Sequence, residues 1–382
     1  MSPLKPAIVI PVFKRLNSLK TLLVSLEKAE YPSNDIQLVF RSHKGASPDV
    51  TSHCETYHWP HGPKTHLKDP DQINLDENLR RCGDLSEVYE YVIILEDDSY
   101  VSPFFYSYTQ QALAFSEKEP SIAQVSLYRY HFHPISGLQH HLLHDLSSVF
   151  YAQKSSTRGQ AFSKEQWTRF RSWLDHMPSP DLRLPSYIKS FGLTNWELQH
   201  NWYLIEQGYY SLMPKLSTVT NTGAVGTHHR SALDSGYFQV PLQVVSQDYS
   251  FTTLKESSLV YDAFFEIHPK AFAHLKPTDL EIDLSGHKPP ALFQSEYVLT
   301  SRPCKEPLES FGSGLKPIEI NIIWNNKGQD INLCKAYNLV KDVKRTKRQN
   351  AKQYFGNVVD VGLYNFVKLK WLKYVDRKQQ KE

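Results

Sequence analysis

Three consecutive carboxylates, Glu96, Asp97 and Asp98, directly follow a strongly apolar segment at residues 91–95. Like charges at close range repel and raise each other's pKa values, so such a triplet is costly without a counter-charge. A divalent cation removes that cost, because hard oxygen ligands suit Mg²⁺ or Mn²⁺, often together with substrate phosphates. A solvated acidic turn is the alternative. The position at the carboxyl end of a buried strand favours the metal site.

The segments around the triplet alternate between strand and helix patterns. An apolar run at residues 7–12 predicts a buried strand, and leucines at positions 19, 22, 23 and 26 predict a helix after it. A second strand at 36–40 completes a βαβ unit, which implies a parallel sheet with a right-handed crossover. Later elements are expected as helices at 79–89 and 104–116 and strands at 91–95 and 122–127. The predicted fold class is therefore α/β, with a mixed, mostly parallel sheet flanked by helices.

Ligands in such sheets bind outside the carboxyl ends of the strands. Residues 11–15, 41–45 and 96–98 all follow predicted strands, so they are expected to meet at one edge. Residues 53–75 are polar and are expected to form a loop, whereas 317–324 has the pattern of a late strand. His140, His141 and His144 are spaced like ligands but lack a partner motif, so we expect loop or surface residues there.

Residues 94–103, Ile-Leu-Glu-Asp-Asp-Ser-Tyr-Val-Ser-Pro, resemble the Asp-X-Asp-type segment of GT-A glycosyltransferases. The form is similar to the Glu-Asp-Asp motif of the Golgi mannoside N-acetylglucosaminyltransferases and of related bacterial family 2-like sugar transferases. The resemblance covers about residues 7–230 in the family's order. Its other segments are 7–15, Cys82-Gly-Asp-Leu85, Ser126-Leu-Tyr128, 158–167, Pro214-Lys-Leu-Ser217, Asn221-Thr-Gly223 and Gly226-Thr-His228.

The resemblance implies a GT-A fold and a donor site built around the acidic triplet. Asp98 would bind Mn²⁺ or Mg²⁺, and the metal would bridge the two phosphates of a nucleotide-sugar. Asp97 and Glu96 would contact the ribose and the sugar. Where the family usually has an Asp that reads the base, this chain has His43; uridine is the expected base. The nucleotide pocket would be formed by Pro11, Val12, Phe13 and Arg15.

Further residues are implied by the later segments. Those expected to fold over the donor diphosphate are Ser217, Thr222 and Gly223. His228 would ligate the metal or contact phosphate, and an ordinary surface pair with His229 is the alternative. Arg80 or Arg81 would supply a cation near the donor, although solvated charges on a helix are the simpler interpretation of the pair.

Glu197 is the expected catalytic base. Inverting transfer needs a carboxylate that removes the proton of the acceptor hydroxyl as its oxygen attacks the anomeric carbon. The family places this base before the Pro-X-X-Ser element, and Asn195-Trp-Glu-Leu198 holds the only carboxylate in that window. The alternative is a capping box, Thr194-X-X-Glu197, in which Glu197 stabilises a helix N-terminus regardless of catalysis.

The formal charge is +3, but it is unevenly distributed. Residues 335–382 carry a net charge of +9, so residues 1–334 sum to −6, which argues against nucleic acid as a partner. The tail is expected to be helical, either packed on the body or attracted to anionic lipids. No leader or spanning segment is evident, and four scattered cysteines are typical of reduced thiols. The protein is thus expected in the cytoplasm, with peripheral contact at the inner face of the membrane.

The sequence predicts a GT-A domain at 1–235, an accessory region of short strands at 236–334 and a basic helical tail at 335–382. The expected activity is metal-dependent, inverting transfer of a hexose or N-acetylhexosamine from a UDP-sugar to a glycan or lipid-linked acceptor in surface-polysaccharide assembly. A catalytically inactive carbohydrate-binding relative is an alternative. A sugar nucleotidyltransferase is another, but it would usually carry a Gly-rich loop, and residues 11–17 contain no glycine.

Overall fold

The computed structural model describes residues 4–223 and 238–340, which form two compact units. The described residues of the first unit are 4–129, 146–180, 186–223 and 238–257, and those of the second are 130–145, 181–185 and 258–340. The expected boundary after residue 235, and the basic tail from residue 341 onward, lie outside the described residues. Within the described ranges, no helix combines the length and apolar character needed to cross a bilayer.

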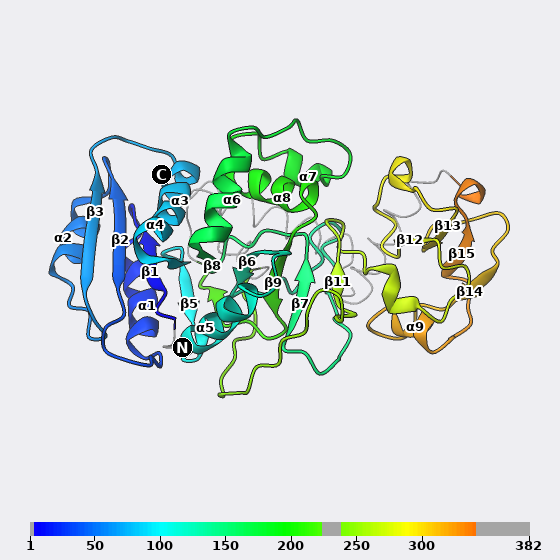
Figure 1. The fold of residues 1–382 in the computed structure, drawn as a ribbon, viewed down its shortest axis with the longest axis horizontal. Helices are drawn as coiled ribbons and strands as arrows, with labels where there is room; N and C mark the ends of the chain where they lie inside the picture. The colour runs from blue at the N-terminus through cyan, green and yellow to red at the C-terminus, as the bar shows by residue number, and fades with distance from the viewer. Residues whose placement is uncertain (1–3, 224–237, 341–382) are drawn as a thin grey trace, which may run out of the picture. The chain divides into compact units, whose positions relative to one another are not determined.

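The first unit is built on a large mixed sheet with the strand order β7-β9-β6-β8-β4-β1-β2-β3 (Figure 1). Strands β1, β2, β3 and β4 pair in parallel, as do β6 and β9, whereas β8 is antiparallel to β4 and β6. The predicted α/β class with a mostly parallel sheet is confirmed. The strand bounds are β1 Ala7–Pro11, β2 Leu38–His43, β3 Lys64–Asp69, β4 Tyr91–Ile94, β6 Ile122–Ser126, β7 Val149–Ala152, β8 Gln160–Ser163 and β9 Tyr210–Pro214.

Helices cover this sheet and supply its core. The three that pack together on one face are α3, α6 and α8, through Leu79, Trp167 and Trp196 against strand residues such as Val92. A Cβ on Gly83 of α3 would collide with the Trp167 ring, so the close approach of α3 and α6 requires glycine there. The helix bounds are α1 Leu16–Glu27, α2 Pro48–Thr56, α3 Leu75–Asp84, α4 Ser86–Tyr89, α5 Phe105–Ser116, α6 Lys164–Leu174, α7 Ser186–Lys189 and α8 Trp196–Glu206.

Two predicted elements are wrong. The expected loop at 53–75 contains the end of α2 and the whole of β3, a partly exposed strand at the end of the sheet whose polar side chains hide the pattern. The expected strand at 317–324 contains a helical turn, α9 Ile320–Ile323. The reason is Asn321, whose buried side-chain amide donates to the carbonyl oxygens of Leu315 and Ile318 and so holds the chain in a turn.

The second unit contains a smaller sheet with the order β12-β13-β15-β14. Strands β12 and β13 are parallel, and β15 is antiparallel to both β13 and β14. The bounds are β12 Leu280–Asp283, β13 Tyr297–Thr300, β14 Glu309–Phe311 and β15 Ile331–Lys335. His140 belongs to this unit and lies in a loop, as expected, but its ring is buried.

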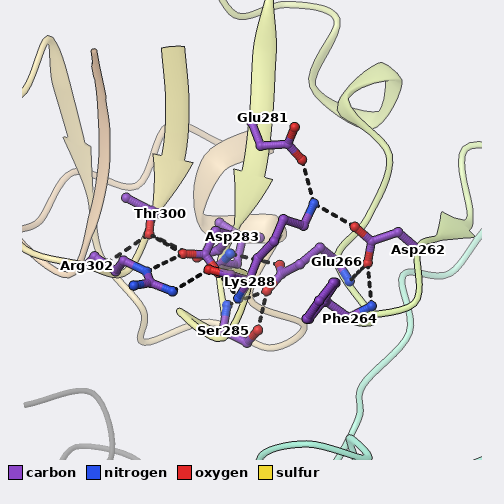
Figure 2. A network of polar contacts seen from close by, with 10 residues as sticks. Asp262, Phe264, Glu266, Glu281, Asp283, Ser285, Lys288, Thr300 and Arg302 are labelled. Carbon is purple, nitrogen blue, oxygen red and sulfur yellow. Dashed lines mark hydrogen bonds and ion pairs between the residues drawn. The ribbon is translucent and has the colours of Figure 1, made fainter. Parts of the chain in front are cut away.

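A buried charge network ties the chain after Tyr261 to β12 and β13 (Figure 2). Lys288, 6% exposed, forms ion pairs with Asp262 at 2.6 Å and Glu281 at 2.5 Å. Arg302 donates to Asp283 at 2.6 Å, and this carboxylate is fully buried. Buried charges of this kind must be paired, so the network fixes the relative position of its segments.

Glu319, just before α9, is a buried carboxylate whose Oε2 has no partner among the described residues. Burial raises its pKa from 4.5 to about 7. The folded state holds this proton more tightly than the unfolded state does. The contribution of Glu319 to the free energy of unfolding is therefore fully present below pH 4.5 and is lost as the pH rises through 7, by at most about 3 kcal/mol. Glu319→Gln should therefore raise the melting temperature more at pH 8 than at pH 5, measured by calorimetry. An equal shift at both pH values would contradict this.

Candidate functional site

The strand register brings three chain segments to one edge of the first sheet. Ile94 of β4 is level with Val9 of β1, and the Leu95 amide donates to the Val9 carbonyl at 3.0 Å. On the other side of β1, the Val12 amide donates to the Arg41 carbonyl at 2.9 Å. The residues that follow β1, β2 and β4 therefore emerge together at the carboxyl ends of parallel strands, where ligands bind in such sheets.

Arg15 links the segment after β1 to the acidic triplet. Its guanidinium donates to Asp97 and, at 2.7 Å, to Asp98 Oδ2. Both carboxylates are buried, at 5% and 2% exposure. Burial disfavours the charged form of Arg15. The neighbouring carboxylates of Asp97 and Asp98 nevertheless raise its pKa above the usual value. The second oxygen of Asp98, Oδ1, is buried without a partner among the described residues, so the structure leaves one carboxylate oxygen free for a ligand.

Burial also governs the protonation of the other two carboxyls. It raises the pKa of Asp97 to about 6, against the attraction of Arg15. Burial, with Asp98 nearby, raises the pKa of Glu96 to about 8, while Arg158 and Arg15 oppose the rise. Glu96 is therefore largely protonated at neutral pH until further positive charge arrives.

Arg158 belongs to this site, although sequence reasoning did not select it. Gln160, the first residue of β8, pairs with both Ile94 and Ser126, and Arg158 precedes it by two residues. The charge of Arg158 opposes the rise in the pKa of Glu96, so the two side chains are neighbours. The Arg158 guanidinium lies 5.8 Å from the Tyr128 ring centroid and 3.8 Å from that of Phe238. Only the antiparallel register of β8 reveals this position, and the sequence alone carries no signal for it.

Phe13 and His43 form a stacked pair, with ring centroids 4.6 Å apart and an interplanar angle of 18°. Nδ1 of His43 lies 3.0 Å from the carbonyl oxygen of Lys44. A carbonyl oxygen only accepts, so this bond requires the proton on Nδ1. Gly45, at φ +92°, makes the turn after β2 that passes beside Phe13.

The segment after β9 folds back onto the acidic triplet. Strand β10 Val219–Asn221 pairs antiparallel with β5 Ser99–Val101. Thr222 consequently donates to the Asp98 carbonyl oxygen from its amide at 2.8 Å and from its hydroxyl at 3.0 Å. The Gly223 amide donates to Asn221 at 2.7 Å. Ser217 is buried, and its hydroxyl accepts from the Arg129 amide at 2.7 Å. His228 lies outside the described residues.

Glu197 is the second residue of α8. Asn195 caps this helix by accepting from the Leu198 amide at 3.1 Å, so the capping box from Thr194, the alternative interpretation of Glu197, is not formed. Glu197 does lie in the first turn of the helix, as that alternative expects. The Glu197 carboxylate instead forms an ion pair with Lys154. Arg80 also lies against α8, where it donates to Gln199 at 2.9 Å.

The predicted site residues thus fall into distinct groups. One group, connected by direct contacts, comprises Arg15, Asp97, Asp98 and Thr222. The stacked rings of Phe13 and His43 lie at the ends of β1 and β2, which are neighbours in the sheet. Glu197 and Arg80 make their contacts at α8. In the described part of the chain, no group of three or more His, Cys, Asp or Glu side chains is placed to enclose a metal ion. The free Oδ1 of Asp98 fits a cation that takes its other ligands from a substrate and water.

No family model and no curated protein sequence matches the chain. Among solved structures, it is similar to a mannosyltransferase, PcManGT, from Pyrobaculum calidifontis in complex with GDP-Man and Mn²⁺, with 12% identity, a TM-score of 0.37 and coverage of 60% of this chain and 61% of that one. It is also similar to S. aureus TarS 1–349, with 12% identity, a TM-score of 0.38 and coverage of 58% of this chain and 61% of that one. A third similar structure is GalNAc-T7 with UDP, GalNAc and Mn²⁺, with 12% identity, a TM-score of 0.38 and coverage of 56% of this chain and 43% of that one. The chain spans less than two thirds of the length of each of these chains.

Proposed function

We propose that this chain is a metal-dependent, inverting glycosyltransferase that uses a nucleotide-sugar, with UDP as the expected nucleotide. The observation that supports this most directly is the buried Asp97–Asp98 pair at the carboxyl end of β4. One carboxylate oxygen there, Asp98 Oδ1, is unpartnered among the described residues, and Arg15 holds the rest of the pair. A buried, incompletely satisfied carboxylate is expected to have a cationic ligand, and a nucleoside diphosphate supplies the remaining oxygens.

In this proposal Asp98 would hold Mn²⁺ or Mg²⁺, which when bound neutralises the diphosphate leaving group. Arg15 orients the two carboxylates, since its guanidinium contacts both. Thr222 fixes the Asp98 backbone with two hydrogen bonds. The nucleoside would lie along Pro11, Val12 and the Phe13–His43 stack. Arg158, whose charge acts on Glu96, is an added candidate for the donor side.

Glu197 remains the proposed base. The acceptor hydroxyl would transfer its proton to the Glu197 carboxylate as the hydroxyl oxygen bonds to the anomeric carbon. The bond from that carbon to the diphosphate oxygen would break at the same time, and the nucleoside diphosphate would leave with the bonding electrons. The side chain is 22% exposed, so solvent or an acceptor can reach it. We propose a glycan or lipid-linked acceptor in surface-polysaccharide assembly, with the basic tail as peripheral membrane contact.

The test is calorimetric titration of the wild-type protein with UDP and with GDP, each with and without Mn²⁺. We expect micromolar binding of one nucleotide that weakens at least tenfold without the metal, because the buried carboxylates repel a free diphosphate. Binding of neither nucleotide would overturn the proposal. Equal affinity with and without Mn²⁺ would overturn the metal role.

A further inference from the structure

Lys154 and Glu197 form an ion pair in which the two partners differ sharply in exposure. The Lys154 side chain is 1% exposed and Glu197 is 22% exposed. We infer that Lys154 is a positioning residue for Glu197, holding one carboxylate oxygen so that the other faces the acceptor hydroxyl. This role rests on the proposed function, because it gives Glu197 a task in sugar transfer.

The contact is specific to one oxygen. Lys154 Nζ donates to Glu197 Oε1, and Oε2 has no hydrogen-bond partner among the described residues. A carboxylate held at one oxygen cannot rotate freely, so Oε2 keeps a fixed direction. A general base works only when its accepting atom lies within hydrogen-bond reach of the proton it takes.

Hydrogen bonds hold the segment around Lys154 against α8, the helix that carries Glu197. On one side of Lys154, Gln153 Nε2 donates to the Leu204 carbonyl of α8 at 3.4 Å. On the other, the Ser155 amide donates to Asn201 Oδ1 at 3.1 Å. Asn201 also donates to the Glu197 carbonyl oxygen, one turn earlier on the same helix. Hydrogen bonds of the chain itself therefore hold the pair in place, which is what orientation of a reacting group requires.

The side chain next to this pair on α8 adds no competing charge. His200, one turn along α8, is fully buried, and its two ring nitrogens have no partner among the described residues. Burial, assisted by Lys154, lowers the pKa of His200 to about 3, so this ring is neutral and adds no second charge. A buried ammonium group needs a counter-charge, and Glu197 supplies one.

The inference is tested with Lys154→Met, Lys154→Arg, Glu197→Gln and the double variant Lys154→Met/Glu197→Gln. UDP and GDP binding with Mn²⁺ is measured first. Release of UDP from UDP-GlcNAc and of GDP from GDP-Man is then measured, with kcat expressed per nucleotide-binding site, so that misfolded protein does not count. The matched control is Lys164→Met, which removes a lysine that pairs with Glu87 at the surface.

We expect Lys154→Met to bind nucleotide within twofold of wild type and to lose at least tenfold in kcat, with little change in the KM for the donor. Lys154→Arg should recover part of kcat, because a guanidinium also donates to Oε1. The double variant should be as inactive as Glu197→Gln, because Lys154 acts only through Glu197. Lys164→Met should match wild type.

The outcomes separate the two proposals. Wild-type kcat in Lys154→Met would overturn the positioning role and leave the proposed function intact. Wild-type kcat in Glu197→Gln would remove both Glu197 as the base and Lys154 as its positioning residue. A wild-type protein that releases neither nucleotide would overturn the proposed function itself, and the positioning role with it.

Discussion

The Asp98→Ala variant is expected to lose the metal-dependent part of nucleotide binding, a drop of at least about 100-fold in affinity. The substitution removes Oδ1, the buried oxygen without a partner among the described residues, and Oδ2, which accepts from Arg15. Titration calorimetry with the nucleotide that binds the wild type, with and without Mn²⁺, measures the effect. In Asp98→Ala the two affinities should become equal and weak.

The loss should not reflect unfolding. The hydrogen bonds from Thr222 go to the Asp98 backbone carbonyl and survive the substitution. Removing one of three clustered carboxyls also relieves repulsion on Glu96 and Asp97. The melting temperature should therefore stay at or above that of wild type. Asp248→Ala, at an exposed position of the same unit, is the matched control and should bind as wild type does. Undiminished Mn²⁺ dependence in Asp98→Ala would exclude this carboxylate as the metal ligand.

The elements that could be predicted from the sequence are those whose apolar side chains follow the pattern of burial. The run at 7–12 gave β1 at Ala7–Pro11 and the run at 91–95 gave β4 at Tyr91–Ile94, because strands buried on both faces are continuously apolar. Both are followed by the residues that contact one another at the sheet edge, since parallel neighbours end on the same side. Strand β3 escaped prediction because it is a polar strand at the sheet's end, and its ladder with β2 uses backbone groups that leave no trace in side-chain pattern.

Long-range pairings account for the rest. Arg158 comes near Glu96 because β8 returns antiparallel beside β4, and no local pattern specifies that neighbour. Lys154 occurs in the polar stretch Gln-Lys-Ser-Ser, which would be taken as exposed loop, yet its side chain is buried against α8. Similarly, residues 130–145 join the second unit from far upstream. Sequence pattern thus located the acidic site, while the charges that surround it required the topology.

Lys288→Met should produce the largest loss of stability in the second unit, about 3 kcal/mol, because removing one partner of a buried ion pair leaves the others uncompensated. The ammonium group joins Asp262 to Glu281, and nearby Glu266 and Asp283 are also buried. Burial raises the pKa of Glu266 to about 8, so the site already resists negative charge.

Hydrogen exchange of the β12 and β13 amides measures the stability of the second unit separately from that of the first. The protection factors of these amides should fall by about 100-fold, which corresponds to a loss of about 3 kcal/mol. Adding Asp262→Asn and Glu281→Gln to Lys288→Met removes the two unpaired charges while keeping the Asp262 oxygen that accepts from the Phe264 and Glu266 amides, so part of the protection should return. Lys327→Met is the matched control: its ion pair with Glu309 is exposed and should contribute less than about 1 kcal/mol. If Lys288→Met lost no more protection than Lys327→Met, the network would not be what holds β12 and β13 to the chain after Tyr261.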